Sequence, residues 1–370
     1  MIIGVLQEPP SETRVSLLPE AVAALTKKGI TVMVESGAGI KATAPDEAYR
    51  QAGAEIKSAT ELISASTIIL SLHPPAYPIP PSKVLIGIYQ PLFNLQQVKD
   101  WATAGVTGFS LDMLPRTSRA QSMDVLSSQA NIAGYKAVLY AANIFPRYFP
   151  MFITAAGSIP PAKVLILGAG VAGLQAIATA RRLGAVVEVF DTRMAVKEEV
   201  MSLGARFVQV EGADDASAAG GYAIEQTAAF LEKQKQKIAE SIARADIVIT
   251  TAQIPGKTAP VLVTTVMIEG MKTGSVIIDL AAATGGNTAL TKNNETIHHN
   301  GVTIVGQSAL AATMPADASK LYGKNVLNFL LLITGKEANL NLNWEDDLVK
   351  GSCITHDGKI VHEKIKQLAG

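Results

Sequence analysis

The sequence contains 370 residues, of which 48% are hydrophobic and 17% are charged, with 32 basic and 32 acidic side chains. This length predicts two or three domains with cores of their own, and the zero net charge argues against an extended nucleic-acid-binding surface. The single cysteine, Cys353, excludes an internal disulfide framework and a cysteine-based zinc site, and it suits a reducing compartment. We expect no metal site.

The first residues lack the basic region and long apolar core of a signal peptide. The longest late apolar run, residues 326–333, is far shorter than the roughly 20 residues that cross a bilayer. We therefore expect a soluble chain, which leaves attachment to a membrane partner open.

The first third of the chain alternates between strand-like and helix-like segments. This alternation predicts βαβ units, which form a parallel sheet covered by helices on both faces. The predicted strands are residues 2–6, 30–34, 67–72, 84–89 and 106–113, and the predicted helices are residues 19–28 and 45–52.

Residues 114–131 interrupt this alternation, because they are polar and show little strand pattern. A helix is expected to begin near residue 127, with Ser127 or Ser128 as its N-cap. Small residues recur along it at 130, 133, 134, 137 and 141, which favours close helix packing. We expect this helix to cross from the first domain into a second one.

Residues 162–193 carry the strongest motif of the chain. An apolar strand at 164–167 is followed by GAGVAG, a helical segment and a second strand that ends at Asp191. In such a unit Gly168 permits the tight turn, Gly170 lets the backbone approach a pyrophosphate, and Gly173 lets the helix pack on the strand. Val171 and Ala172 open the helix, whose free N–H groups attract phosphates. The motif predicts a Rossmann dinucleotide-binding fold.

Asp191 lies about 20 residues beyond the turn, where a carboxylate accepts hydrogen bonds from an adenosine ribose. A carboxylate here favours NAD(H), because it repels a 2′-phosphate. Arg193, two residues later, is able to accommodate that phosphate, so the preference stays open at this point. Thr192 and Arg193 are counted with Asp191 among the expected cofactor contacts.

The second half continues the sheet to a total of about six parallel strands. Further cofactor contacts are expected at the carboxyl ends of two of these strands, where the dinucleotide passes in a doubly wound sheet. Those residues are Thr251, Ala252, Gln253, Asp279 and Leu280. The predicted strands are residues 206–210, 246–251, 275–280 and 302–305, with a helix at 225–244.

The tail, residues 314–333, is predicted to be helical and to return to the first domain. A turn at residues 356–359 predicts a hairpin near the end of the chain. We therefore expect an α/β protein of two domains, each a parallel sheet built from βαβ units. The first domain would comprise residues 1–128 and 318–370, and the Rossmann domain residues 129–317.

Three stretches carry a resemblance to a known family. The opening GVLQEPPSETRVSLLPEAV and the central LILGAGVAGLQAIATARRLGA resemble signatures shared by alanine dehydrogenase and the nicotinamide nucleotide transhydrogenases. The stretch RTSRAQSMDVLSSQANIAGY, residues 116–135, resembles the loop that holds the nicotinamide in the NAD(H)-binding alpha subunit of proton-translocating NAD(P) transhydrogenase. The resemblance extends over essentially the whole chain.

The resemblance implies site residues. Arg116, Gln121 and Asp124 match the family's Arg-Gln-Asp loop, and Ser127 follows as a further cofactor contact. Gln and Ser are suited to fixing a carboxamide, which has a donor and an acceptor, while an Arg–Asp pair would rigidify the loop. The structural alternative is a surface salt bridge and a helix cap in a connector. Tyr222 matches a mobile-loop tyrosine of the family, with an ordinary surface loop as its alternative.

The resemblance also implies the function. Hydride would pass directly from NADH on this chain to NADP⁺ on a separate NADP(H)-binding subunit. A membrane-spanning subunit would couple this transfer to proton translocation. The chain would be a cytoplasmic homodimer, attached through its partners to the inner face of the membrane.

The alternative function is that of an alanine-dehydrogenase-like, NAD-dependent amino-acid dehydrogenase, which needs acid/base groups beside the hydride acceptor. That family's lysine, histidine and aspartate are replaced here by His73, Gln90 and Ala283. Hydride transfer between two nicotinamides needs no proton shuttle, only rings held with reacting carbons about 3–3.5 Å apart. Glu8 and Arg14 either pair to hold the first turn or, as in alanine dehydrogenases, the arginine anchors a substrate carboxylate. A third hypothesis, an NAD-sensing regulator, would need a DNA-binding element or basic patch, and the sequence contains neither.

Overall fold

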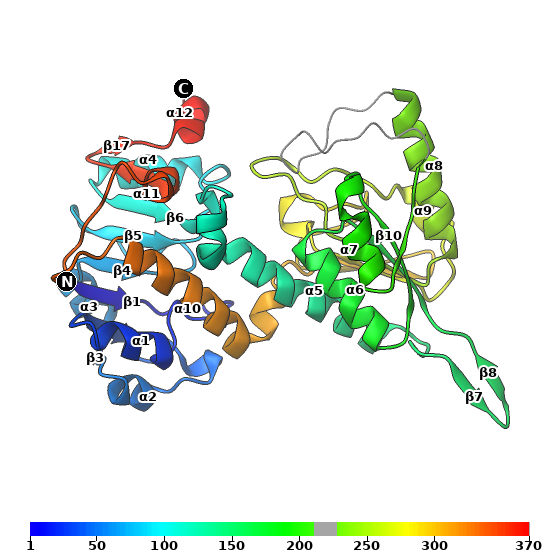
Figure 1. Cartoon of the computed structure of the whole chain (residues 1–370), viewed down its shortest axis with the longest axis horizontal. Coiled ribbons are helices and arrows are strands. Elements are labelled where there is room, and N and C mark those ends of the chain that lie inside the picture. The colour runs from blue at the N-terminus through cyan, green and yellow to red at the C-terminus, as the bar shows by residue number, and fades with distance from the viewer. Residues whose placement is uncertain (211–227, 370) are drawn as a thin grey trace. The chain divides into compact units, whose positions relative to one another are not determined.

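The computed structural model describes residues 1–210 and 228–369. Contacts between Cα atoms divide the chain into two compact units (Figure 1). Unit 1 comprises Met1–Gln129 and Ala312–Gly370, and unit 2 comprises Ala130–Ala311. The chain thus enters unit 2 along one helix, α5, and leaves it just before another, α10. The sequence placed the second crossing at 317/318, inside α10; the contacts place it before that helix begins.

Unit 1 is built on an eight-stranded sheet that is parallel except for the two C-terminal strands. Its central strands β4, β5 and β6 have every residue buried, as expected for a sheet covered on both faces. The strand order is β17 (Lys359–Ile360), β16 (Cys353–His356), β6 (Thr107–Ser110), β5 (Val84–Gly87), β4 (Ile68–Leu70), β1 (Ile2–Val5), β2 (Thr31–Glu35) and β3 (Glu55–Lys57).

Helices cover both faces of this sheet, each with its own apolar cluster. One face packs against α1 (Pro19–Thr26), α2 (Asp46–Gln51), α10 (Pro315–Leu332) and α11 (Asp347–Ser352). The other packs against α3 (Ala59–Ala65), α4 (Leu95–Thr103) and α12 (Glu363–Ala369). Ser58 caps α3 through a capping box with Glu61.

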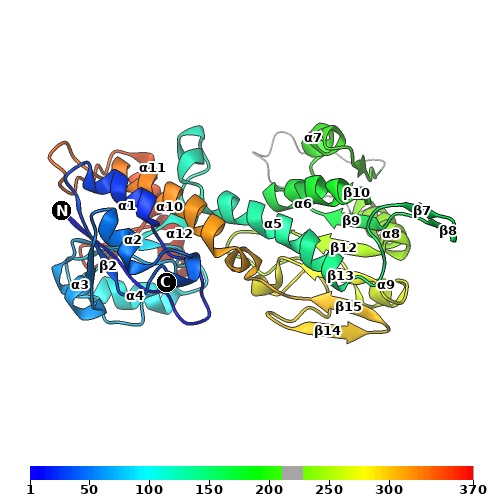
Figure 2. The same ribbon diagram turned by 90° about the horizontal axis from the view of Figure 1, so that it is seen from below.

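Unit 2 contains a seven-stranded sheet with six parallel strands and one antiparallel edge strand (Figure 2). The strand order is β11 (Arg206–Phe207), β10 (Val186–Phe190), β9 (Lys163–Leu167), β12 (Ile247–Thr250), β13 (Val276–Asp279), β15 (Val302–Val305) and β14 (Thr296–His299). One face packs against α5 (Val125–Ile144), α6 (Val171–Arg182) and α7 (Lys197–Ser202), and the other against α8 (Ala228–Arg244) and α9 (Thr265–Glu269).

The predicted α/β class is confirmed, with two largely parallel sheets and the Rossmann arrangement in unit 2. The sequence missed the short elements β3, α3 and α4, and the hairpin of β7 (Phe152–Thr154) and β8 (Gly157–Ile159) that projects from unit 2 in Figure 1. The missed strands have only three residues each, too few to show a period. In the part of the chain that the structure describes, no helix has the length and hydropathy required to cross a membrane.

Candidate dinucleotide site

The glycine-rich turn joins β9 to α6 in unit 2. Gly168 has a φ of +107°, which disfavours any side chain. A Cβ on Gly173 would lie 1.9 Å from the carbonyl oxygen of Gly168, so the helix can approach the strand only if this residue is glycine. A Cβ on Gly170 would meet no described atom within 4 Å. The space above Gly170 therefore fits the predicted approach of a pyrophosphate.

Helix α6 begins at Val171, directly after this turn, with Gly170 as its N-cap. The first N–H groups of an α-helix have no partner within the helix, and together with the helix dipole they favour an anion. The turn is braced from β12, because the Thr251 hydroxyl donates to the carbonyl oxygen of Gly168 at 3.1 Å. Gly134 of α5 lies so close to Ala172 that a Cβ there would be 2.1 Å from the Ala172 oxygen.

Asp191 follows β10 and lies beside the turn. Its Oδ2 accepts a hydrogen bond from the Ala169 N–H at 2.7 Å. Arg193 donates to both carboxylate oxygens, from Nε at 3.0 Å and from a terminal nitrogen at 2.9 Å. Burial alone would raise the pKa of Asp191, but the hydrogen bonds from Arg193 and Ala169 outweigh it and hold that pKa below its ordinary value. The carboxylate stays ionised at neutral pH.

The segment after β12 is held by one buried amide. The N–H of Ala252 donates to Oδ1 of Asn287 at 2.9 Å, and Nδ2 of Asn287 donates to the carbonyls of Ala252 and Pro260 at 2.8 Å each. The Gln253 amide donates to the Leu280 carbonyl at 2.9 Å. The loops after β12 and β13 are therefore tied together. Sequence reasoning missed Asn287, although its place after a Gly-Gly pair marks a sharp turn.

Asp279 requires a correction. Its side chain is fully buried, and its carboxylate accepts hydrogen bonds from three backbone N–H groups and one hydroxyl. These donors belong to residues 281–291 of the same loop: the N–H groups of Ala281, Asn287 and Thr288, and the hydroxyl of Thr291. The carboxylate points into the loop, so its role changes from the predicted cofactor contact to bracing the loop.

In unit 1, Asp124 caps helix α5. Oδ1 accepts from the N–H of Ser127 at 2.9 Å, and Oδ2 accepts from the Ser127 hydroxyl at 2.6 Å. The prediction of Ser127 or Ser128 as the N-cap was wrong, because the helix starts at Val125 and the residue before it is Asp124. The described hydrogen bonds make Asp124 the residue that orients the Ser127 side chain.

The turn that carries Gln121, Ser118–Met123, is a 3₁₀-helix fixed from outside. Arg119 forms ion pairs with Asp346 at 2.6 Å and with Asp347 at 2.7 Å. Asn325 and Asn328 of α10 each donate to the Ser122 carbonyl at 2.9 Å. Arg116 and Gln121 are exposed. Sequence reasoning missed these anchors, because they lie more than 200 residues from the turn along the chain.

Near the carboxyl ends of β1 and β4 lies a buried charged cluster. Arg14 pairs with Glu12 at 2.7 Å and donates to Gln129 at 2.8 Å. Glu12 also lies 2.8 Å from Nε2 of His73. The predicted Glu8–Arg14 pair was wrong: Glu8 instead accepts from the backbone N–H groups of Leu72 and His73.

The two buried carboxyls titrate in opposite directions. Burial raises the pKa of Glu8 from 4.5 to about 7, despite its backbone hydrogen bonds. Burial would raise the pKa of Glu12 as well, but hydrogen bonds from Arg14 and His73 dominate and hold it well below its ordinary value. Glu12 is therefore a permanent anion, whereas Glu8 changes charge near neutral pH.

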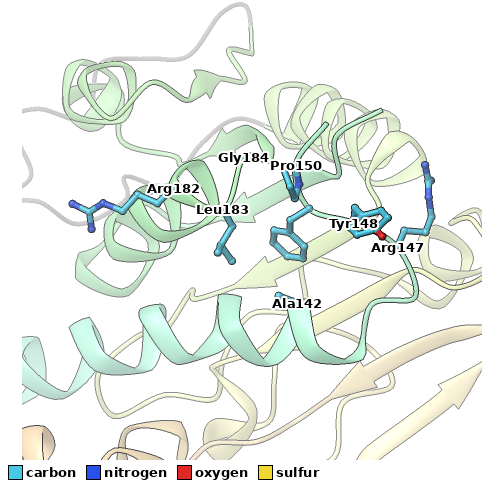
Figure 3. Close-up of a pocket in the computed structure, with 8 residues that line it drawn as sticks. Ala142, Arg147, Tyr148, Pro150, Arg182, Leu183 and Gly184 are labelled. Carbon is cyan, nitrogen blue, oxygen red and sulfur yellow. The ribbon is translucent and has the colours of Figure 1, made fainter. Parts of the chain in front are cut away.

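A cavity of about 490 Å³ in unit 2 is not the predicted site. Its lining includes Tyr148, Pro150, Leu183 and Gly184 (Figure 3). Residues 183–184 precede β10, so the cavity lies at the amino ends of the strands, opposite the glycine-rich turn. Tyr222 lies outside the described residues. Among the residues that are described, no group of three or more His, Cys, Asp or Glu side chains forms a metal site.

The family descriptions match in two adjacent segments. "Alanine dehydrogenase/PNT, N-terminal domain" matches residues 4–133, and "Alanine dehydrogenase/PNT, C-terminal domain" matches residues 137–363. The chain belongs to the alanine dehydrogenase/PNT family. The resemblance predicted from the motifs is confirmed over nearly the whole length.

Relatives within the family differ in their similarity to this chain. An NAD(P) transhydrogenase subunit alpha of Rhodospirillum rubrum is 45% identical, and the match covers 95% of each chain. The corresponding protein of Rickettsia prowazekii is 43% identical, with a match that covers 99% of this chain and 97% of its own. The alanine dehydrogenase of Bacillus subtilis is 26% identical, covering 100% and 95%.

Solved structures follow the same division. A transhydrogenase from Sinorhizobium meliloti superposes with a TM-score of 0.90 at 44% identity, covering 98% of this chain and 100% of its own. An L-alanine dehydrogenase gives a TM-score of 0.80 at 26% identity, covering 100% and 99%. The chain thus resembles transhydrogenase alpha subunits more than it resembles alanine dehydrogenases.

Proposed function

We propose that this chain is the NAD(H)-binding alpha subunit of a proton-translocating transhydrogenase. The carrying observation is the likeness to transhydrogenase alpha subunits over nearly the whole chain, at 45% identity against 26% for alanine dehydrogenases. When bound, the cofactor supplies the hydride. The acceptor, NADP⁺, is held by a separate NADP(H)-binding subunit, and a membrane-spanning subunit couples the transfer to proton movement. The chain therefore works at the membrane only through these partners.

The residues of unit 2 fit a dinucleotide. The open space at Gly170 and the start of α6 suit the pyrophosphate, with contacts from Val171 and Ala172. Asp191 accepts the adenosine ribose, and Thr192 and Arg193 lie beside it. Thr251, Ala252, Gln253 and the backbone of Leu280 contact the remaining part of the cofactor. Gly168 and Gly173 shape the turn.

In unit 1, the loop of residues 116–127 orients the nicotinamide. The amide of Gln121 and the hydroxyl of Ser127 offer the donor and acceptor groups that a carboxamide needs. Asp124 fixes Ser127, and Arg116 contributes positive charge to the same loop. Hydride transfer between two nicotinamides requires this kind of positioning and no acid/base residue. Tyr222 is proposed to close over the cofactor.

Two observations support the transhydrogenase function over an amino-acid dehydrogenase. Gln90 and Ala283 carry no group that titrates near neutral pH. His73 is paired with Glu12, which ties it to the Arg14 cluster. An oxidative deamination would need a free proton acceptor beside the substrate.

The homodimer is also proposed. Between residues 148 and 153, four large apolar side chains are at least 41% exposed: Tyr148, Met151, Phe152 and Ile153. The rings of Tyr148 and Phe152 pack with their centroids 4.5 Å apart, which holds the base of the β7–β8 hairpin in shape. A preformed apolar strip of this kind is typical of a subunit interface.

The test is hydride transfer from NADH to NADP⁺, with and without the NADP(H)-binding subunit, with pyruvate plus ammonium assayed in parallel. We expect transfer to NADP⁺ only with the partner, and no oxidation of NADH by pyruvate and ammonium. Oxidation by pyruvate and ammonium without the partner would instead identify an amino-acid dehydrogenase.

A further inference from the structure

Arg193 fills the place that a ribose would take on Asp191. Oδ1 of Asp191 accepts from the backbone N–H of Arg193 at 2.8 Å and from its Nε at 3.0 Å. Oδ2 accepts from the Ala169 N–H at 2.7 Å and from the Arg193 guanidinium at 2.9 Å. A carboxylate has about four acceptor positions in all. All of them are therefore occupied, two by backbone groups and two by one side chain.

The two kinds of donor differ in how easily they leave. The N–H groups of Ala169 and Arg193 belong to the turn after β9 and the segment after β10, so they move only with the backbone. The guanidinium is on a flexible side chain that is 31% exposed, whereas the Asp191 side chain is only 6% exposed. Arg193 is the donor that solvent, or a ligand, reaches first.

We propose that Arg193 is a specificity-determining residue, whose side chain occupies Asp191 in the free protein and must leave it when an adenosine ribose binds. The inference deepens the proposed function and rests on it, because it assigns the adenosine ribose to Asp191. The ribose hydroxyls take over the two acceptor positions that the guanidinium vacates. Arg193 thus lowers the affinity for NAD(H) and remains beside the ribose as a cation.

The same displacement explains how a 2′-phosphate is rejected. A phosphate has no hydroxyl to donate to Asp191, and it can attract Arg193 only by breaking the pair and leaving the carboxylate without its cation. Burial raises the energy of such an uncompensated carboxylate. The raised pKa of Arg193, caused first by its hydrogen bonds to Asp191, agrees with a strong pair. Without Asp191, the guanidinium would be free to bind a phosphate.

The surroundings of the pair leave room for such an exchange. Asp191, Thr192 and Met194 line a small pocket together with apolar residues after β10 and β11, and Gln234 of α8. The charged neighbour that acts on Arg193 besides Asp191 is Glu199 of α7. Apolar walls and one amide suit an adenosine, so the pair lies at its edge.

The experiment is equilibrium binding of NADH and of NADPH to the full chain and three variants: Arg193→Met, Asp191→Ala and the double variant. Removing the competing donors in Arg193→Met should tighten NADH binding by on the order of fivefold, the value of about one net hydrogen bond, and weaken NADPH binding. Asp191→Ala should weaken NADH binding and strengthen NADPH binding at least tenfold. The double variant should lose this gain.

A matched control is Arg206→Met on the neighbouring strand β11, where the arginine is 81% exposed and lies 3.7 Å from Glu188. It should leave both dissociation constants unchanged. Unchanged or weaker NADH binding in Arg193→Met, or NADPH binding in the double variant equal to that in Asp191→Ala, would overturn the inference alone. If the unaltered chain bound neither nucleotide, the proposed function would fail and this inference with it.

Discussion

The Gln121 side chain is exposed on a turn that is fixed from outside, so it can be changed without disturbing the fold. Gln121→Asn withdraws the amide by one methylene. If Gln121 orients the nicotinamide, hydride transfer should slow at least tenfold while the Kd for NADH changes less than about threefold, because alignment is lost more than contact area. Stopped-flow rates and equilibrium binding measure the two quantities.

Ser122→Ala is the matched control, because the hydrogen bonds from Asn325 and Asn328 reach the backbone carbonyl of Ser122, which the substitution keeps. It should leave both rate and affinity unchanged. Equal losses of rate and affinity in Gln121→Asn would contradict an orienting role.

Glu8 predicts how the stability of unit 1 depends on pH. Its pKa is about 7 in the folded chain and 4.5 ordinarily, so the folded form holds a proton that the unfolded chain releases. Stability from this group is full below pH 4.5 and is lost as pH rises to about 7, an effect of up to about 3 kcal/mol. Glu12 acts in the opposite sense and only below pH 4.5, so it does not mask this window.

The measurement is urea unfolding followed by tryptophan fluorescence between pH 5 and 7.5. Both tryptophans, Trp101 and Trp344, belong to unit 1, so the signal reports on that unit. Glu8→Gln should show a flatter pH dependence than the unaltered chain, whatever constant stability it loses with one acceptor. Parallel pH profiles in the two proteins would refute the assignment.

At the scale of the element, the β9–turn–α6 unit separates two roles of glycine. Gly173→Ala places a methyl group 1.9 Å from the Gly168 oxygen, which should destabilise unit 2 by about 1–3 kcal/mol and abolish NADH binding. Gly170→Ala meets open space and keeps an allowed φ of −76°, so stability should fall by less than about 1 kcal/mol.

NADH affinity should nevertheless fall more than tenfold in Gly170→Ala, because the methyl group occupies the space assigned to the pyrophosphate. Thermal unfolding and NADH titration of the two variants test the pair. Normal NADH binding by Gly170→Ala would mean that the pyrophosphate does not approach at this residue.

The elements show what the sequence was able to predict. Buried parallel strands such as Val302–Val305 are continuous apolar runs, and their bounds were predicted to the residue. The start of α5 was missed because Asp124, Ser127 and Ser128 are all good caps, and only the helix geometry selects Asp124. The contact of Asp191 with Arg193 spans two residues, so the sequence suggested it; the contact of Arg119 with Asp346 spans 227 residues, which no local pattern reveals.

At the scale of the whole molecule, the β7–β8 hairpin predicts the oligomeric state. Ile153 is 77% exposed, and Ile153→Asp should convert the proposed dimer to a monomer, because a charge in an apolar interface loses its hydration. Sedimentation or light scattering measures the mass. Val266→Asp on α9, equally exposed at 76% in the same unit, is the matched control and should stay dimeric. A dimer that survives Ile153→Asp would exclude this hairpin as its interface.

The discontinuity of unit 1 has a consequence for biosynthesis. Its sheet receives β16 and β17, and its apolar face receives α10, only after all of unit 2 has been synthesised. On the ribosome, residues 1–129 therefore wait with strand β6 unpaired at one edge, while unit 2 can complete its own sheet. An exposed strand edge is prone to pairing with other chains. The period between the emergence of β6 and that of β16 is thus when the nascent chain depends most on chaperones.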